Sequence, residues 1–209
     1  AIPAEFIIKT VEECGKKDVK DLLIITSGFS EIGNIKLEEQ LRKTIQKYNI
    51  RMIGPNGLGT FDGNSKFDAL FLPRYRLKRP MGGGISFVCQ SGAVGSTILD
   101  LATKEGQKFA KFVSYGNATT IDETDIIDYL KNDDETKVIC AYIEAVKNGK
   151  KFIKVMKEVI RKKPVIIILE NVGHQLERIL ISKFGDKITA IVGSLEGAAE
   201  RKKKEIVEL

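Results

Sequence analysis

The sequence is poor in the features that secreted and membrane proteins need. Its three cysteines, Cys14, Cys89 and Cys140, cannot all pair within the chain. No apolar run approaches the roughly 18 to 20 residues of a membrane span, and the N-terminus lacks the pattern of a secretory signal. We therefore expect a soluble, cytoplasmic protein with reduced thiols, without a membrane partner.

Tryptophan is absent, and together with the high content of lysine, glutamate and isoleucine this is typical of thermophile proteins. The 209 residues are 43% hydrophobic and 30% charged, which excludes a disordered or collagen-like chain. Basic clusters at residues 74–79, 161–163 and 201–204 contribute to the net charge of +6. They fall in a predicted linker and near predicted helix ends, so solvated cations are favoured over a nucleic-acid partner.

From residue 84 onward, short β-branched runs alternate with amphipathic stretches, which predicts a doubly wound parallel sheet in an α/β, flavodoxin-like fold. The runs are apolar on both faces, as strands covered by helices on both sides must be. The predicted strands are residues 85–89, 109–114, 137–142, 164–169 and 187–192. The predicted helices are residues 93–104, 123–131, 149–161, 175–183 and 196–207.

The first part of the chain shows a shorter alternation, with helices predicted at residues 4–14 and 37–48 and strands at 22–26 and 51–53. A two-stranded sheet is marginal alone. Since residues 1–3 resemble the tail of a strand and no initiator Met is present, we expect a truncated chain or a half-domain packed on the larger one. Residues 63–83, rich in Pro and Gly, indicate a linker. The predicted domains are a partial Rossmann-like unit (1–72) and a flavodoxin-like domain (82–209).

The most informative motif is the strand, small-residue turn and helix of residues 85–95, with Gln90, Ser91, Gly92 and Ala93 at the turn. The free N–H groups of the first helical turn can bind a phosphate, aided by the helix dipole. Ser91 can either cap the helix or donate its hydroxyl to the anion. The alternative is an ordinary cap with close strand-helix packing at Gly92 and Gly95.

Other polar turns follow predicted strands, at the sheet edge where open α/β sheets bind ligands. Gly54-Pro55-Asn56 forms a tight turn, although such a pattern is usually only a turn. Gly116 and Asn117 end a later strand. Glu144 follows the third predicted strand of the large domain; it can orient an imidazole or hold a metal, although a solvated edge glutamate is commoner. We predict no metal site.

In this order and spacing, the chain up to about Leu169 resembles the alpha part of ADP-forming acyl-CoA synthetases (acetyl-CoA synthetase, ADP-forming), relatives of the succinyl-CoA synthetase alpha chain. The segments that carry the resemblance are residues 2–5, 26–31, 53–56 with 58–59, 90–93, 114–117 and 163–165. The resemblance implies an acid-thiol ligase, if the chain is complete. Acyl-CoA and phosphate give an acyl phosphate, a histidine takes the phosphoryl group, and a loop carries it to ADP.

The resemblance also implies cofactors, partners and site residues. CoA and phosphate would bind this chain, while ADP or ATP with Mg would bind a separate ATP-grasp partner in an oligomer, because no ATP-grasp pattern fits here. Glu144 would support the phosphohistidine. The turn of Gln90, Ser91, Gly92 and Ala93 would bind phosphate, and Gly54, Pro55, Asn56, Gly116 and Asn117 would lie beside the CoA thiol and acyl pocket.

The chain departs from the family at two places. In the family, a strand and a glycine-rich turn at the start of the CoA-binding domain grip the nucleotide end of CoA; as the sequence starts at Ala1, we expect this part of the CoA site to be missing. The phosphohistidine loop is replaced by a short connection, residues 170–173, followed at once by the only histidine, His174. A local match to residues 194–198 would place Leu195 at the histidine position, but these residues follow the fifth predicted strand, so the order of strands and helices favours the connection before His174. His174 is therefore the phosphohistidine, a capping or surface residue, or a neighbour of an omitted loop.

A rival hypothesis from another class is a non-catalytic binding or interaction module derived from a CoA ligase. A third, weaker hypothesis is a flavodoxin-like flavin protein, although nothing in the turns demands flavin. Acid-labile, alkali-stable phosphoryl labelling of His174 discriminates the enzyme from the module.

Overall fold

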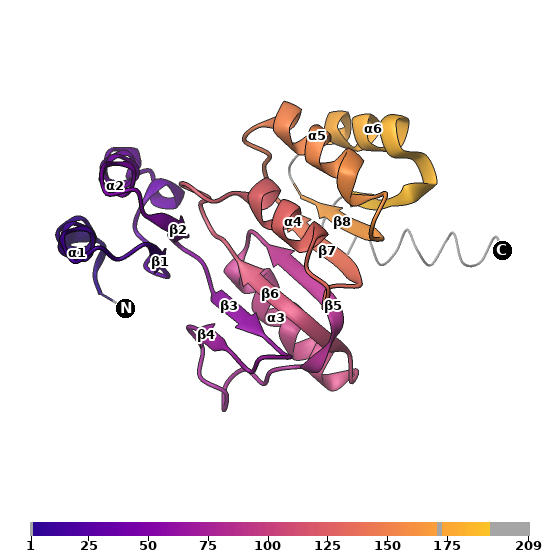
Figure 1. The fold of residues 1–209 in the computed structure, drawn as a ribbon, viewed down its shortest axis with the longest axis horizontal. Coiled ribbons are helices and arrows are strands. Elements are labelled where there is room, and N and C mark those ends of the chain that lie inside the picture. Colours follow the sequence, from indigo (N-terminus) through magenta and orange to yellow (C-terminus); the bar gives the residue numbers. More distant parts are fainter. Residues whose placement is uncertain (1, 171–172, 193–209) are drawn as a thin grey trace.

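In the computed structural model, residues 2–170 and 173–192 are described (Figure 1). Strands Gly59–Asp62 (β3), Asp68–Leu70 (β4), Met81–Cys89 (β5), Lys108–Ser114 (β6), Val138–Ile143 (β7), Val165–Leu169 (β8) and Ile188–Val192 (β9) form one sheet. Their order is β4-β3-β6-β5-β7-β8-β9. Neighbours are parallel except at β3, which is antiparallel to both β4 and β6.

The parallel strands β6-β5-β7-β8-β9 follow the order 2-1-3-4-5 when numbered along the chain from β5. This is the flavodoxin-like order of a doubly wound sheet, in which the chain reverses direction across the sheet beside its first strand. The predicted fold class is therefore confirmed. Within the described residues, no helix is long and apolar enough to cross a membrane.

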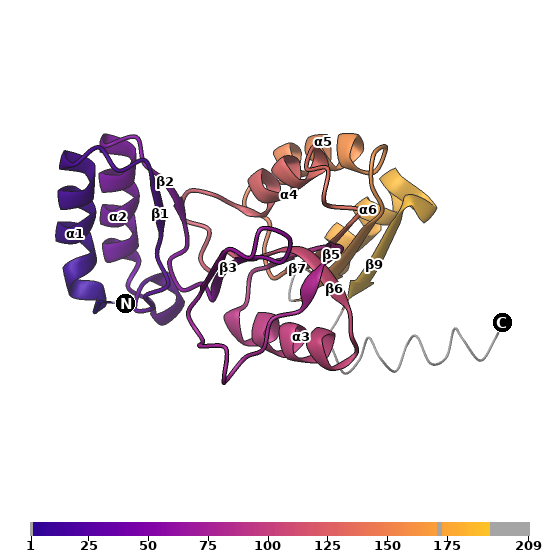
Figure 2. The ribbon, with the colours of Figure 1, turned by 60° about the horizontal axis from the view of Figure 1, so that its bottom comes forward.

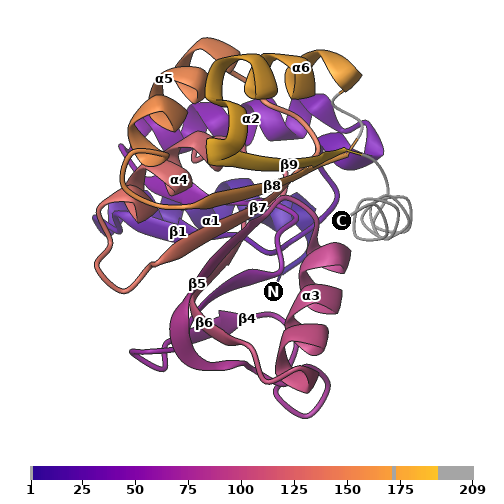
Figure 3. The ribbon, with the colours of Figure 1, turned by 90° about the vertical axis from the view of Figure 1, so that its right-hand side faces the viewer.

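Among the described residues, helices lie on both faces of this sheet (Figure 3). Gly92–Lys104 (α3) packs on one face, where Leu99 and Ala102 meet Phe87 and Phe112. Glu123–Lys131 (α4), Gly149–Val159 (α5) and Gly173–Phe184 (α6) pack on the other. Apolar side chains recur along each helix at a spacing of three or four residues, so each helix buries one stripe. These helices agree closely with the predicted ones, while the predicted helix 196–207 lies outside the described residues.

The N-terminal unit contains helices Ala4–Lys16 (α1) and Ile35–Lys47 (α2), with a short 3-10 helix, Ser30–Ile32 (η1), between them. Strands Asp21–Leu23 (β1) and Arg51–Ile53 (β2) pair in parallel. The two long helices lie side by side along this pair (Figure 2), and their apolar stripes bury a separate small core. Cys14 lies in α1, Cys89 in β5 and Cys140 in β7, and they form no disulfide with one another.

The linker prediction for residues 63–83 does not hold, because the segment contains β4 and the start of β5. Strands β3 and β4 are short, and neither has the apolar run from which the other strands are predicted. Gly82 and Gly83, which the linker prediction includes, lie within β5 and allow close approach of the neighbouring chain: a Cβ at Gly83 would lie 2.2 Å from Lys108 Cβ. The two predicted domains remain a prediction, although residues 59–70 contribute β3 and β4 to the large sheet.

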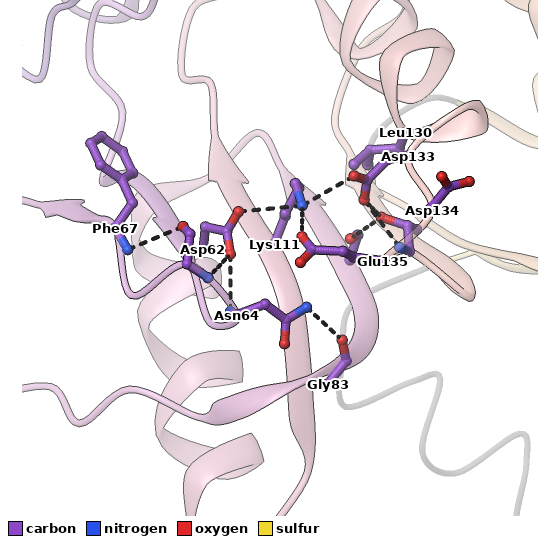
Figure 4. A network of polar contacts seen from close by, with 12 residues as sticks. Asp62, Asn64, Phe67, Gly83, Lys111, Leu130, Asp133, Asp134 and Glu135 are labelled. Atoms are coloured by element: carbon purple, nitrogen blue, oxygen red, sulfur yellow. Dashed lines mark hydrogen bonds and ion pairs between the residues drawn. The ribbon is translucent and has the colours of Figure 1, made fainter.

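A network of carboxylates around Lys111 ties β3 and β6 to the segment after α4 (Figure 4). Lys111 Nζ lies 2.6 Å from Glu135 Oε2, 3.2 Å from Asp133 Oδ1 and 3.3 Å from Asp62 Oδ2. Burial opposes the positive charge of Lys111, but hydrogen bonds to these carboxylates outweigh it and raise its pKa. For Asp62 and Asp133, burial alone would raise the pKa, but hydrogen bonds outweigh it, and the pKa of each carboxyl group is lowered.

The substitution Lys111→Met should therefore destabilise the fold by about 2 to 3 kcal/mol at pH 7, because Asp62 and Asp133 would stay charged and poorly solvated. The lowered pKa values stabilise the fold above the ordinary carboxyl pKa, and this contribution is lost as the pH falls through them. Urea unfolding at pH 7 and pH 3 should show the loss shrinking in acid. Lys104→Met, which breaks the exposed pair with Asp100, should cost less than about 1 kcal/mol. Equal losses in both variants would contradict a role for the network.

Candidate functional site

The register of the central strands brings the predicted site residues to one edge. Cys89 of β5 lies opposite Ser114 of β6 and Tyr142 of β7, so these three strands end at the same level. A cavity of about 620 Å³ lies at these carboxyl ends and reaches the loops of the N-terminal unit. Of the predicted site residues, the cavity is lined by Asn56, Gln90, Ser91, Gly92, Ala93, Gly116, Asn117 and Glu144. This is the position where open α/β sheets bind ligands.

The N-terminus of α3 points free donors into this cavity. Ser91 caps the helix, accepting a hydrogen bond from Val94 N at 3.4 Å. Among the described residues, no acceptor bonds the N–H groups of Gly92 and Ala93. The Ser91 hydroxyl oxygen accepts from Val94 N, and its proton has no acceptor among the described residues. The hydroxyl can therefore donate a hydrogen bond to a ligand. Capping and anion binding are therefore compatible, and the N-terminal dipole favours an anion.

The glycines of this turn serve different purposes. A Cβ at Gly95 would lie 2.8 Å from Phe112 Cζ, so Gly95 allows α3 to pack closely on β6. A Cβ at Gly92 would meet only Leu58, at 3.7 Å or more, which is ordinary contact. The packing alternative therefore describes Gly95, whereas at Gly92 the space beside the helix N-terminus is open.

Glu144 contributes a carboxylate to the cavity from the end of β7. Its side chain is half-buried, and this burial raises its pKa. No side chain or N–H within the described part of the chain donates a hydrogen bond to its carboxylate. The backbone is held instead, because Gln90 Oε1 accepts from Glu144 N at 2.9 Å and from Ala145 N at 3.1 Å. Glu144 thus has a raised pKa and lines the same cavity as the free backbone donors of α3.

Gly54 and Gly116 each pack closely against neighbouring backbone. A Cβ at Gly116, where φ is +58°, would lie 2.1 Å from Pro55 O, and Asn117 N donates to the same oxygen at 3.0 Å. A Cβ at Gly54 would lie 2.1 Å from Ile24 O. Gly54 and Pro55 are not among the residues that line the cavity. CoA or acyl binding by Gly54, Pro55, Asn56, Gly116 and Asn117 remains a prediction.

A carboxylate that the sequence analysis did not assign to the site, Glu31, also lines the cavity. Asn117 Nδ2 donates to Glu31 Oε2 at 2.7 Å and to Glu38 Oε2 at 2.9 Å, which joins the loop after β6 to the N-terminal unit. Burial opposes ionisation of both glutamates, but hydrogen bonds outweigh it and lower both pKa values. Residues 26–31, which include Glu31, carry part of the family resemblance. No local sequence pattern pairs Glu31 with Asn117, which is 86 residues away.

A second unassigned carboxylate, Glu123, begins α4 and is fully buried. Its Oε2 has no hydrogen-bond partner among the described residues, and Oε1 accepts only a long bond from Thr124 Oγ1, at 3.3 Å. Burial therefore raises its pKa. A carboxyl group in such surroundings costs the folded state free energy when it is ionised.

We expect Glu123→Gln to stabilise the fold at pH 7 by about 1 to 2 kcal/mol, because the amide carries no charge to bury. A raised pKa gives stability that is present below the unfolded value and lost as the pH rises through the folded value. The gain should therefore vanish near pH 4, which thermal unfolding at both pH values would measure. Glu105→Gln, at an exposed residue, should change stability by less than about 0.5 kcal/mol at either pH. A variant less stable than the parent at pH 7 would contradict this explanation.

His174 is the second residue of α6, and its side chain lies outside the described part of the structure. Residues 194–198, the alternative local match, also lie outside the described residues. The three interpretations of His174 therefore remain predictions.

Comparison with known proteins gives one family and a consistent set of relatives. The profile described as "Succinyl-CoA ligase like flavodoxin domain" matches residues 82–188. Acetate–CoA ligase [ADP-forming] of Methanocaldococcus jannaschii is 43% identical over 80% of this chain and 23% of its own length. Acetate–CoA ligase [ADP-forming] II subunit alpha of Pyrococcus furiosus is 39% identical over 88% of this chain and 40% of its own length.

Solved structures agree with these relatives. PH0766 from Pyrococcus horikoshii OT3 superposes with a TM-score of 0.81 at 35% identity, over 92% of this chain and 42% of that one. The dinucleotide forming acetyl-coenzyme A synthetase 1 of Ca. Korarchaeum cryptofilum, in complex with phosphate and ADP, gives a TM-score of 0.76 at 33% identity, over 94% of this chain and 42% of that one. This chain therefore spans less than half the length of each of these relatives.

Proposed function

Because this chain belongs to the family of succinyl-CoA ligase-like flavodoxin domains, we propose that it is the alpha-type part of an ADP-forming acyl-CoA synthetase. The curated relatives are named as ADP-forming acetate–CoA ligases or their alpha subunits. The proposed overall reaction converts acyl-CoA, ADP and phosphate into a carboxylate, ATP and CoA.

The observation that carries this proposal is that one cavity is lined both by the free backbone donors of α3 and by the carboxyl group of Glu144, whose pKa is raised. The N–H groups of Gly92 and Ala93 and the hydroxyl of Ser91 suit the oxygens of phosphate. In the first step, a phosphate oxygen held there attacks the thioester carbonyl, and the CoA thiolate leaves. The same donors hold the phosphate so that its attacking oxygen faces the thioester carbonyl carbon.

In the second step, an imidazole nitrogen attacks the phosphorus of the acyl phosphate, and the carboxylate leaves. Glu144 accepts the N–H of the other ring nitrogen, which stabilises the imidazolium as it forms. We propose His174 for this role. The phosphoryl group then passes to ADP.

The walls of the cavity also suit the organic substrate. Ile25, Leu58 and Phe71 add apolar surface beside the polar turn. An acyl group and the thiol end of CoA require such a surface next to the phosphate position.

ADP binding is assigned to a separate ATP-grasp partner with Mg, in an oligomer that contains both chains. The name "subunit alpha" of the Pyrococcus furiosus relative supports a second subunit in that enzyme. The proposal is tested by mixing this chain with a separate ATP-grasp chain, acetyl-CoA, Mg-ADP and phosphate, and measuring the ATP formed. ATP should form only when both chains are present. ATP formation by this chain alone would contradict the partner, and none with both chains would contradict the proposed function.

A further inference from the structure

The side-chain oxygen of Gln90 is occupied by three donors from two strand ends. It accepts from the backbone N–H groups of Glu144 and Ala145, at 2.9 and 3.1 Å, and from Tyr115 Oη at 3.3 Å. Tyr115 follows β6 and is fully buried, whereas Glu144 follows β7. Gln90 itself follows β5, the strand between these two. One oxygen thus joins the carboxyl ends of the three strands that form the cavity.

These contacts also fix the orientation of the Gln90 amide. Turning the amide over would place its NH₂ group against the N–H groups of Glu144 and Ala145, where donor would face donor. The nitrogen of Gln90 has no acceptor among the described residues, and Gln90 lines the cavity. The structure therefore separates the two ends of the amide: the oxygen holds protein backbone, and the nitrogen remains available to a ligand.

The backbone of Gln90 is equally constrained. Gln90 N donates to Tyr142 O at 3.1 Å, and Gln90 immediately precedes Ser91, the cap of α3. Strands β5 and β7 are paired up to Cys89 and Tyr142. The Gln90 side chain therefore crosses from the end of β5 to the end of β7 to reach the backbone of Glu144. Gln90 therefore links the N-terminus of α3 directly to the Glu144 turn.

We propose that Gln90 is a positioning residue that holds the Glu144 turn at a fixed place beside the N-terminus of α3. Its catalytic consequence rests on the proposed function, but the positioning itself does not. Gln90 acts through hydrogen bonds to the backbone of Glu144 and Ala145, and its effect on the reaction is the placement of the Glu144 carboxylate. Lys147 Nζ, bonded to Asn117 O and Ala118 O at 2.7 Å, ties the other side of the same turn.

Two variants of similar length separate an acceptor at this position from mere bulk. Gln90→Glu keeps an oxygen that can accept from both N–H groups, whereas Gln90→Met fills the space without an acceptor. Amide hydrogen exchange of this chain, followed by NMR, reports on the bonds directly. In Gln90→Met, protection of the Glu144 and Ala145 amides should fall by about fivefold or more, and in Gln90→Glu it should be retained. The Glu170 amide, which donates to Ile143 O, is the internal control and should stay within about twofold of the parent.

A second measurement follows the carboxyl group itself. In Gln90→Met, the pKa of Glu144 measured by carboxyl ¹³C NMR should fall toward its ordinary value as the turn gains solvent, and in Gln90→Glu it should not fall. Unchanged protection and unchanged titration of Glu144 in Gln90→Met would overturn the proposal. If both measurements respond as expected while the two-chain assay yields no ATP, the proposed function fails and the positioning role stands.

Discussion

Gly92→Val should abolish the stabilisation of this chain by phosphate. The parent should gain about 3 to 6 °C in melting temperature at a phosphate concentration ten times its Kd. A valine side chain at Gly92 fits the backbone, because a Cβ there meets only ordinary contacts, but its methyl groups would occupy the space beside the free N–H groups. The expected gain for the variant is less than about 1 °C.

Matched controls distinguish a lost site from a weakened fold. Gly149, like Gly92, is the first residue of a helix, and its N-cap Asn148 accepts from Lys151 N. Gly149 does not line the cavity, so Gly149→Val should keep the full phosphate response. Ser91→Ala should lose only part of it, because the backbone donors remain. Full stabilisation of Gly92→Val by phosphate would mean that the turn is packing alone.

Glu144→Gln should slow phosphoryl transfer from an acyl phosphate to the histidine by about 100-fold. The amide keeps the shape of the side chain but carries no negative charge to stabilise the imidazolium. Labelled acetyl phosphate provides the measurement, since phosphohistidine is labile in acid and stable in alkali. Because burial raises the pKa of Glu144, the parent rate should fall with decreasing pH at a higher pH than for an exposed glutamate.

Two further variants complete this test. His174→Asn should carry no label if His174 is the acceptor. Glu31→Gln, which changes another carboxylate of the cavity wall, should alter the rate by less than about threefold, because Glu31 is engaged with Asn117 and the backbone of the N-terminal unit. Complete absence of label from the parent would favour the non-catalytic module over the enzyme.

The elements with strong periodicity could be predicted from the sequence. In α5, Phe152, Met156 and Val159 form one buried stripe, and the predicted helix begins at the observed residue. Strand β8 has five apolar residues in a row and was placed to within one residue. Strand β3 could not be found in this way, because it pairs with β6, whose partner residues lie more than 40 positions away. Strand β4 has only three residues and pairs with β3 alone.

The candidate site shows the same limit. The turn at Ser91 and Gly92 was predicted because its signal is local: a strand, small residues and a helix. The bond from Asn117 to Glu31 and the bonds from Glu144 and Ala145 to Gln90 join residues that are distant in the chain. No spacing rule connects them, so only the folded chain shows that Gln90 Oε1 serves the backbone.

The central claim is that the N-terminus of α3 holds phosphate in the cavity shared with Glu144. A crystal structure of this chain grown with phosphate tests it most directly. The account predicts an anion whose oxygens lie within about 3.2 Å of Gly92 N and Ala93 N, with Ser91 Oγ as a further donor. A saturated crystal with no anion at this turn, or with phosphate bound only elsewhere, would contradict it.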